Sequence, residues 1–160
     1  MQLLTQYGDD VFRLAMSYLG NRADAEDISQ TVFLRVLRTK CEPLPEKEKS
    51  WLLTCTANAC KNHLQSFWKR NVGALDEAIP FYQEQDQTLY DAVMKLAPKY
   101  RAVIHLYYYE GYSQGEIGEI LHLSRTAVQT RMSRAREMLK KELHDNEGAL
   151  SEYDGTGETF

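Results

Sequence analysis

The sequence has no apolar run longer than a few residues, so none of its segments could form a helix that spans a lipid bilayer. Its first residues, MQLLTQYGDD, lack the basic segment and following apolar run of a secretory signal. We therefore expect a chain that remains in the cytoplasm and is not inserted in a membrane.

Cysteine is scarce, and its spacing argues against a metal site or a disulfide framework. Cys41, Cys55 and Cys60 form no CxxC pair, and no histidine lies at zinc-ligand spacing from them. The four histidines are scattered, and the chain has no glycine-rich phosphate loop and no nucleophile motif. The sequence thus predicts reduced cysteines, no cofactor, no metal and no enzymatic activity.

Basic residues are also fewer than acidic ones. The chain has 19 Lys and Arg and 23 Asp and Glu, which gives a formal net charge of −4. The acids are unevenly placed, however. Residues 145–160 hold five of them and no base, so the rest of the chain has a net charge of +1. An acidic total therefore does not exclude nucleic-acid binding, which depends on a local basic patch.

Apolar residues recur at helical spacing along most of the chain. In the first predicted helix they fall at every third or fourth position, namely Leu4, Tyr7, Val11, Leu14 and Tyr18. Gly20 is placed to end this helix. A second helix, from about Ala25 to Lys40 with Asp24 as its cap, has apolar residues in nearly every direction. Such a helix is either central in a small bundle or offers one face to a partner.

A third helix, Trp51 to about Arg70, is expected after a proline-containing loop at 41–50, with Ser50 as its cap. One face of this helix has polar side chains at i, i+3, i+4 and i+7: Asn58, Lys61, Asn62 and Gln65. Amides and bases near aromatic residues are suited to holding unpaired bases by hydrogen bonding and stacking. A solvated polar face is the alternative that the residues leave open.

Residues 71–85 contain Gly73, Pro80 and several acids, and they continue no apolar periodicity. They therefore predict a linker between two domains. A short helix at 86–96 follows, and then a helix that has Pro98 in its first turn and ends at Glu110-Gly111.

Residues 113–143 predict a helix–turn–helix. Ser113 and Glu116 have the spacing of a capping box, and Ser124 is placed to cap the second helix. An inward apolar stripe on the second helix consists of Val128, Met132, Ala135 and Leu139. Residues 124–141 contain six Lys or Arg and one acid. A helix with a packed back and a basic, polar front suits the DNA major groove, although an ordinary amphipathic surface helix has the same pattern.

Three blocks of the sequence resemble the extracytoplasmic-function (ECF) group of bacterial sigma-70 factors. They are GNRADAEDISQTVFLRVLR, SWLLTCTANACKNHL and APKYRAVIHLYYYEGYSQGEIGEILHLSRTAVQTRMSRARE. They are similar to the family's polymerase-docking helix, its promoter-melting segment and its region 4. The resemblance implies an all-α fold with two small helical domains joined by a flexible linker. The second would be a four-helix helix–turn–helix domain of winged-helix-like or homeodomain-like type. The implied boundaries are region 2 at 1–70, a linker at 71–85, region 4 at 86–144 and a disordered acidic tail at 145–160.

The resemblance also implies a function and a role for individual residues. The chain would bind core RNA polymerase at its clamp coiled coil and flap, recognise the −35 and −10 promoter elements, and open the start site. The implied polymerase contacts are Asp27, Gln30 and Phe33. The implied −10 and melting contacts are Ser50, Trp51, Asn58, Lys61 and Asn62. The implied −35 contacts are Arg125, Thr126, Gln129, Thr130, Arg131, Ser133, Arg134 and Arg136, of which Arg131 and Arg136 are better placed for phosphates or packing. The family also implies an anti-sigma partner.

A dimeric helix–turn–helix regulator that binds duplex DNA without polymerase is the alternative function, and it would leave the Asn58 face without a use. Three residues depart from the family pattern. Gly115 and Gly118 lie within a helix, where each lowers helix propensity by up to about 1 kcal/mol, and His122 stands in the turn. We expect Gly118 to permit close packing, while Gly115 has no evident purpose.

Overall fold

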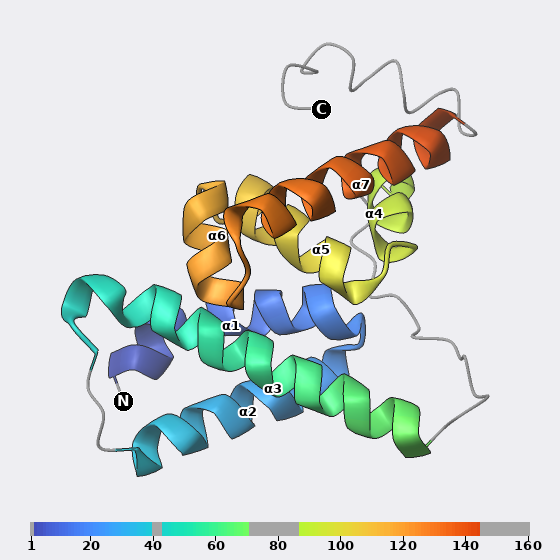
Figure 1. The fold of residues 1–160 in the computed structure, drawn as a ribbon. Helices are drawn as coiled ribbons and strands as arrows, with labels where there is room; N and C mark the ends of the chain where they lie inside the picture. Colours follow the sequence, from blue (N-terminus) through green and yellow to red (C-terminus); the bar gives the residue numbers. More distant parts are fainter. Residues whose placement is uncertain (1, 40–42, 71–86, 145–160) are drawn as a thin grey trace.

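The computed structural model describes residues 2–39, 43–70 and 87–144, and every regular element within these ranges is helical (Figure 1). The elements are α1 (Gln2–Leu19), α2 (Arg22–Arg38), the 3₁₀ turn η1 (Pro45–Lys47), α3 (Glu48–Arg70), α4 (Gln87–Met94), α5 (Pro98–Ile104), the π-helical turn η2 (His105–Tyr109), α6 (Gln114–Leu121) and α7 (Arg125–His144). The prediction of an all-α fold is confirmed. Cys41, the predicted linker and the predicted tail lie outside the described residues. No helix within the described ranges is long and apolar enough to cross a membrane.

Helices α1, α2 and α3 pack against one another around a shared apolar core. Val11 and Leu14 of α1 and Leu52 of α3 are fully buried there. Gly20 ends α1 as predicted: its φ of 67° lies in the left-handed region, and its N–H donates to the Met16 carbonyl at 2.8 Å. The predicted apolar stripe of the first helix therefore corresponds to its buried face at Val11, Leu14 and Tyr18, but not at Leu4, which is 47% exposed.

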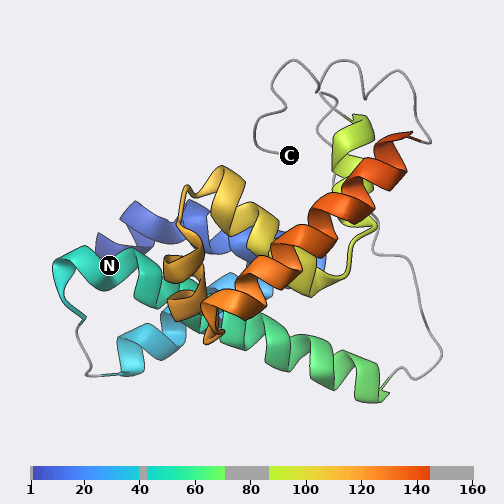
Figure 2. The same cartoon turned by 45° about the horizontal axis from the view of Figure 1, so that its top comes forward.

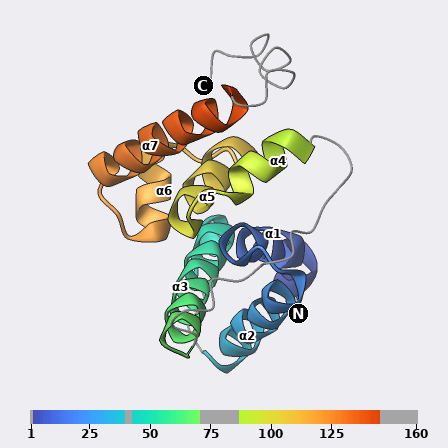
Figure 3. The same cartoon turned by 90° about the vertical axis from the view of Figure 1, so that its right-hand side faces the viewer.

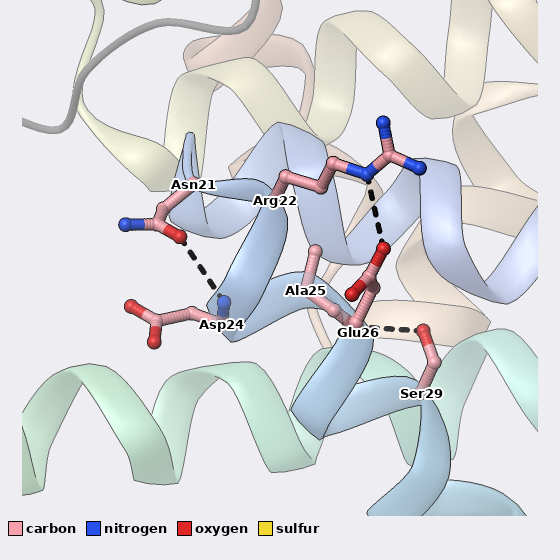
Figure 4. A network of polar contacts seen from close by, with 6 residues as sticks. All are labelled: Asn21, Arg22, Asp24, Ala25, Glu26 and Ser29. Carbon is pink, nitrogen blue, oxygen red and sulfur yellow. Dashed lines mark hydrogen bonds and ion pairs between the residues drawn. The ribbon is translucent and has the colours of Figure 1, made fainter.

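Helix α2 begins earlier than the sequence suggested, and Asp24 is not its cap. Asn21 is the N-cap, and its side-chain oxygen accepts a hydrogen bond from the Asp24 N–H at 3.1 Å (Figure 4). Asp24 instead lies in the first turn, where a negative charge is favourable near the helix N-terminus. Arg22 and Glu26 pair one turn apart at 3.0 Å on the exposed side of the same turn. Because Asn and Asp are equally good N-caps, the sequence alone did not separate the two.

Helix α3 also begins earlier than predicted. Pro45 starts the turn η1, which leads directly into α3 at Glu48. Proline favours this position because its φ is already helical and its missing N–H is not needed there. Ser50 therefore lies inside helical backbone, and its hydroxyl donates to the Lys47 carbonyl at 3.2 Å. The prediction that Ser50 caps α3 is wrong.

Helix α7 packs against α4, α5 and α6 to form the second group. The predicted inward stripe of α7 is confirmed: Val128, Met132, Ala135 and Leu139 are all buried. The helix that begins at Pro98 continues through η2, and Glu110 is its C-terminal cap. Gly111 follows with a φ of 77°, so the predicted end of this helix is also confirmed.

The two groups of helices pack directly on each other, with α5 against α1 and α6 against α3 (Figures 2 and 3). Arg101 of α5 joins the groups, and only 8% of it is exposed. Its guanidinium donates to the Ser17 and Tyr18 carbonyls of α1 at 2.6 and 2.7 Å. It also donates to the Met94 and Leu96 carbonyls of its own group. A single buried cation thus satisfies four carbonyl groups, and two of these lie at the C-terminal end of α1.

Candidate nucleic-acid interface

The turn between α6 and α7 is set by side-chain caps on both helices. The capping box is confirmed: Ser113 Oγ accepts from the Glu116 N–H at 3.2 Å, and a Glu116 carboxylate oxygen accepts from the Ser113 N–H at 3.0 Å. The prediction that Ser124 caps α7 is also confirmed, since its Oγ accepts from the Ala127 N–H at 3.1 Å. His122 ends α6 with a φ of 56°, a conformation that residues other than glycine seldom adopt.

Gly118 allows the two helices of the hairpin to approach closely. A Cβ atom at this position would lie 2.6 Å from the carbonyl oxygen of Leu123, which is backbone that cannot easily move. The Leu123 N–H in turn donates to the Gly118 carbonyl at 2.8 Å. The expected role of Gly118 in close packing is confirmed. Gly115 has no such role, because the nearest atom to its Cβ position is Ser113 Oγ at 3.9 Å.

The outer face of α7 presents the expected polar and basic side chains to solvent. Six of the residues assigned to −35 contact are exposed: Arg125, Thr126, Gln129, Thr130, Ser133 and Arg134. They lie opposite the buried stripe, so none of them is needed to hold the helix in place. Donors and acceptors at this spacing can reach base edges and phosphates when a helix enters the major groove.

Arg131 and Arg136 differ from these six, because both are half-buried. The Arg136 Nε donates to the Tyr108 hydroxyl at 3.1 Å, and its guanidinium lies 5.9 Å from the centre of the Tyr107 ring. This arrangement fastens α7 to η2. The charge of Arg131 helps to lower the pKa of Lys61 in the first group of helices. Of the two uses foreseen for these arginines, the contacts of Arg136 match packing.

The polar face of α3 is only partly free. Asn58 and Asn62 are exposed. Lys61, between them in sequence, is half-buried, and its Nζ donates to the Leu121 carbonyl at the end of α6 at 3.4 Å. Burial, together with the nearby charge of Arg131, lowers the pKa of Lys61 from its usual value. The structure therefore brings Lys61 into contact with the helix–turn–helix and leaves it only partly exposed to solvent.

A cavity of about 520 Å³ lies beside the start of α3. Ser50 and Trp51, both assigned to the −10 region, line one side of it, and Glu119 and Ile120 of α6 line the other. The loop residues Pro43 and Leu44 are also part of the lining. Trp51 is half-buried here, so part of its ring area remains available for contact.

The exposed face of α2 includes Asp27 and Gln30 but not Phe33. Only 8% of Phe33 is exposed, and it packs in the core. The large apolar side chains that do face outward are Leu34, 52% exposed, and Leu37, 64% exposed. These two leucines follow Asp27 and Gln30 at helical spacing and share one face with them. Phe33 was assigned because of the family resemblance, and no local pattern in the sequence distinguished it from Leu34 and Leu37.

Glu110 forms an ionic contact across the two groups of helices. Its carboxylate lies 2.6 Å from Lys49 Nζ at the start of α3, and only 3% of its side chain is exposed. The neighbouring His105 and the Lys49 ammonium hold the pKa of Glu110 at about 2, against the opposing effect of burial. Burial acts against the charge on Lys49, but Glu110 and Asp10 raise the pKa of this lysine overall. Residue spacing in the sequence could not reveal this pair, because the partners are far apart in the chain.

The cysteines in the described part of the chain have the environment of structural side chains. Cys55 is half-buried and Cys60 is buried, and both are free thiols. Burial raises the pKa of Cys60 to about 12 and also raises that of Cys55, so neither forms a reactive thiolate at neutral pH. In the same ranges, no group of three or more His, Cys, Asp or Glu side chains could hold a metal ion.

Comparison with known proteins matches both groups of helices to one family. A model of sigma-70 region 2 matches residues 3–70, and a model of sigma-70 region 4 matches residues 86–139. The ECF RNA polymerase sigma factor SigW of Bacillus subtilis is 31% identical, with 87% of this chain and 86% of SigW covered. The ECF sigma factor SigE of Mycolicibacterium smegmatis is also 31% identical, with 94% of this chain covered. This chain spans only 64% of the length of SigE.

Solved structures share the fold. The sigma factor RpoE of Bartonella quintana, in complex with the anti-sigma factor NepR, superposes with a TM-score of 0.74 at 21% identity and covers 89% of this chain and 95% of its own. CnrH, in complex with the cytosolic domain of CnrY, gives a TM-score of 0.63 at 23% identity and covers 90% and 86%. With a region 2 match, a region 4 match and relatives that align over nearly its whole length, the chain belongs to the ECF group of RNA polymerase sigma factors.

Proposed function

We propose that this chain directs core RNA polymerase to promoters by holding DNA at two separate places. Helix α7 would bind duplex DNA at the −35 element, and α3 would bind bases of the −10 element after they leave the stack. The observation that supports this division most directly is the face of α7, where six polar or basic side chains are exposed opposite a fully buried stripe. The chain itself would supply no catalysis, since polymerase carries out the synthesis of RNA.

The −35 role rests on the chemistry of the exposed α7 residues. Arginine pairs with guanine, glutamine pairs with adenine, and serine and threonine bond to bases or phosphates. Arg125, Gln129 and Ser133 recur every fourth residue and so form one row along the exposed side of α7. Thr126, Thr130 and Arg134 form the neighbouring row, so a helix in the major groove could present residues of both rows to base edges and phosphates. Arg136, which is fastened to Tyr108, would orient this helix rather than select sequence.

The −10 role rests on Asn58, Asn62 and the cavity beside Ser50 and Trp51. Exposed amides on adjacent turns of α3 can hydrogen-bond the edges of unpaired bases. A flipped base needs a pocket whose contacts offset the few kcal/mol lost on unstacking. The cavity of about 520 Å³ is large enough to admit one, and the exposed part of Trp51 offers a surface for stacking.

The polymerase contact is proposed on the outer face of α2. Asp27 and Gln30 supply polar contacts there, and Leu34 and Leu37 supply exposed apolar area that the fold leaves uncovered. Interfaces commonly combine an apolar centre with a polar rim. Because polymerase acts in the cell interior, the chain would act there as well. RpoE of Bartonella quintana is bound to an anti-sigma factor, and we extend this kind of partner to the present chain.

Transcription from a promoter library with sigma-free core polymerase tests the proposal. We expect defined transcripts only when the chain is added. Arg134→Ala should weaken binding to duplex −35 DNA, with a loss of about 1–3 kcal/mol for a lost base contact. Asn58→Ala and Asn62→Ala should preserve duplex binding and impair start-site opening, which permanganate footprinting reports.

Two outcomes would count against this function. If no transcript starts and the purified chain instead protects a palindromic duplex by itself, the dimeric-regulator alternative is favoured. Equal loss of duplex binding in the Arg134, Asn58 and Asn62 variants would contradict the division of roles between α7 and α3.

A further inference from the structure

A second cavity, of about 720 Å³, lies between α1 on one side and α4, α5 and η2 on the other. It shares no lining residue with the cavity beside Trp51. Pockets that hold small organic ligands commonly have volumes of about 300–1,000 Å³. No residue with a proposed contact to DNA or polymerase lines this cavity, so the proposed function leaves it without a use.

The lining of this cavity is rich in aromatic rings. They belong to Phe12, Tyr90, Tyr108 and Tyr109. The Tyr109 ring is 58% exposed and stacks on His105, with 5.0 Å between the ring centres and 14° between the ring planes. The Tyr108 hydroxyl is held by the hydrogen bond from Arg136. Rings that are already held in place lose little conformational entropy when a flat ligand stacks on them.

The backbone of η2 also points to a ligand at this cavity. The π-helical turn His105–Tyr109 supplies three of the lining residues, His105, Tyr108 and Tyr109. Such turns are rare, and they are frequent at functional sites. The apolar side chains Met16, Val93, Met94 and Ile104 complement the rings from the neighbouring helices.

Two arginines give the cavity an excess of positive charge. Arg101 lines it with only 8% of its area exposed, and its four acceptors are neutral carbonyl groups. No carboxylate within residues 2–39, 43–70 or 87–144 is ion-paired with Arg101. Burial lowers the pKa of Arg101, as expected for a cation that is withdrawn from water without a counter-ion. The Arg13 guanidinium lies at the exposed edge, 5.3 Å from the centre of the Tyr109 ring.

An occupant that fits these properties is flat, mostly apolar and singly negative. We propose that the cavity binds a small aromatic carboxylate, with its ring against Tyr108 and Tyr109 and its carboxylate at Arg13, near the charge of Arg101. Arginine can pair with a carboxylate through two parallel hydrogen bonds. Asp9, the acid of the lining, would repel a second negative charge, so a monoanion fits better than a dianion. This site goes beyond the promoter and polymerase roles and does not depend on them.

The methionines of the chain provide a direct test by methyl NMR. Met16 and Met94 line the cavity, whereas Met132 is fully buried in the α7 stripe and Met138 is 40% exposed on α7. The probe is 2-naphthoate, added to the full chain with ¹³C-labelled methionine methyl groups. We expect saturable shifts of the Met16 and Met94 resonances, with a Kd below about 1 mM. The Met132 and Met138 resonances should stay in place.

The charge of the ligand is tested with 2-naphthamide, which has the same ring without the negative charge. It should bind at least about tenfold more weakly, because the charge-assisted hydrogen bonds are lost. Arg13→Gln should weaken naphthoate binding about tenfold for the same reason and leave naphthamide binding unchanged. The matched control is Arg38→Gln, which removes an exposed arginine from α2 and should bind both probes as the wild type does.

Filling the cavity provides an independent test of its location. Val93→Trp places a large ring in the cavity from α4 and should abolish the methyl shifts. Val36→Trp makes the same change at a half-buried valine of α2 and should leave them intact. If V93W does not fold, as judged by circular dichroism, the methyl shifts of the wild type and the R13Q comparison still decide.

Four results would overturn the proposal. They are the absence of saturable shifts at Met16 and Met94, naphthamide binding as tight as naphthoate binding, unchanged naphthoate affinity in R13Q, and a folded V93W that still binds. None of these measurements contains DNA or polymerase. Failure of this site would therefore be distinct from failure of the proposed function.

Discussion

At the residue scale, the two glycines of α6 look alike in the sequence and differ in the structure. Gly118 faces the Leu123 carbonyl oxygen, 2.6 Å from where a Cβ would lie, whereas the nearest atom to a Cβ at Gly115 is Ser113 Oγ at 3.9 Å, an ordinary contact distance. Gly118→Ala should destabilise the chain by about 1–3 kcal/mol, because backbone must shift to accept the methyl group. Gly115→Ala should stabilise it by up to about 1 kcal/mol through helix propensity.

Thermal unfolding followed by circular dichroism measures both changes. Each kcal/mol corresponds to a shift in Tm of about 2–4 °C for a chain of this size. Gly118→Ala should also weaken duplex DNA binding, since it disturbs the turn that positions α7, while Gly115→Ala should leave binding unchanged. Equal changes in Tm for the two variants would mean that the close approach of Gly118 to Leu123 does not affect the free energy of unfolding.

Which residue of a helix faces outward was the least predictable feature at this scale. The sequence showed that α2 has apolar residues on more sides than one core can bury. The structure confirms this, because some of these residues are buried and others are exposed. The sequence did not show that Phe33 takes the inward direction and Leu34 and Leu37 the outward ones. Burial is decided by where neighbouring helices lie, and no local pattern contains that information. The same limit applies to Lys61, whose spacing placed it on the polar face although α6 covers it.

At the element scale, α2 offers an exposed surface whose apolar part is Leu34 and Leu37. Replacing both with Ser should reduce affinity for core polymerase by at least about tenfold, because fully burying a leucine side chain contributes about 1.5–3 kcal/mol. The fold should keep its Tm, since both side chains already face solvent. Pull-down or biolayer interferometry with core polymerase gives the affinity.

The control for this prediction is Leu4→Ser, which changes an exposed leucine of α1 that is 47% accessible. It should leave polymerase affinity unchanged. Phe33→Ala should behave differently from both, losing about 3–5 kcal/mol of stability because it empties core volume. If Phe33→Ala weakened polymerase binding while the fold remained fully stable, the family-based assignment of Phe33 would be preferred to the surface of Leu34 and Leu37.

Helices and their ends were otherwise the features best predicted from the sequence. Helix periodicity, the Ser113 capping box, the glycine ends and the buried stripe of α7 are local patterns, and the structure confirms them. Two features had no local signal. The π-helical turn His105–Tyr109 arises in a segment that packs against both α1 and α6. The Arg101 contacts join residues more than eighty positions apart, so they depend on tertiary structure.

At the scale of the whole molecule, one restraint on free-chain DNA binding is expected from charge placement. It concerns residues 145–160, whose five acids and absence of bases turn a basic remainder into an acidic whole. We hypothesise that this acidic segment competes with DNA for the basic face of α7. Such a competition acts through water and is therefore screened by salt.

Ending the chain at His144 tests the second restraint. Removing five acids should tighten binding of the purified chain to duplex DNA severalfold at low salt. The gain should shrink as ionic strength rises, because the Debye length falls to about 8 Å at physiological salt. A matched variant with Asn and Gln at the five acidic positions keeps the length and should behave like the truncation. Unchanged duplex affinity of the truncated chain at low salt would refute the competition.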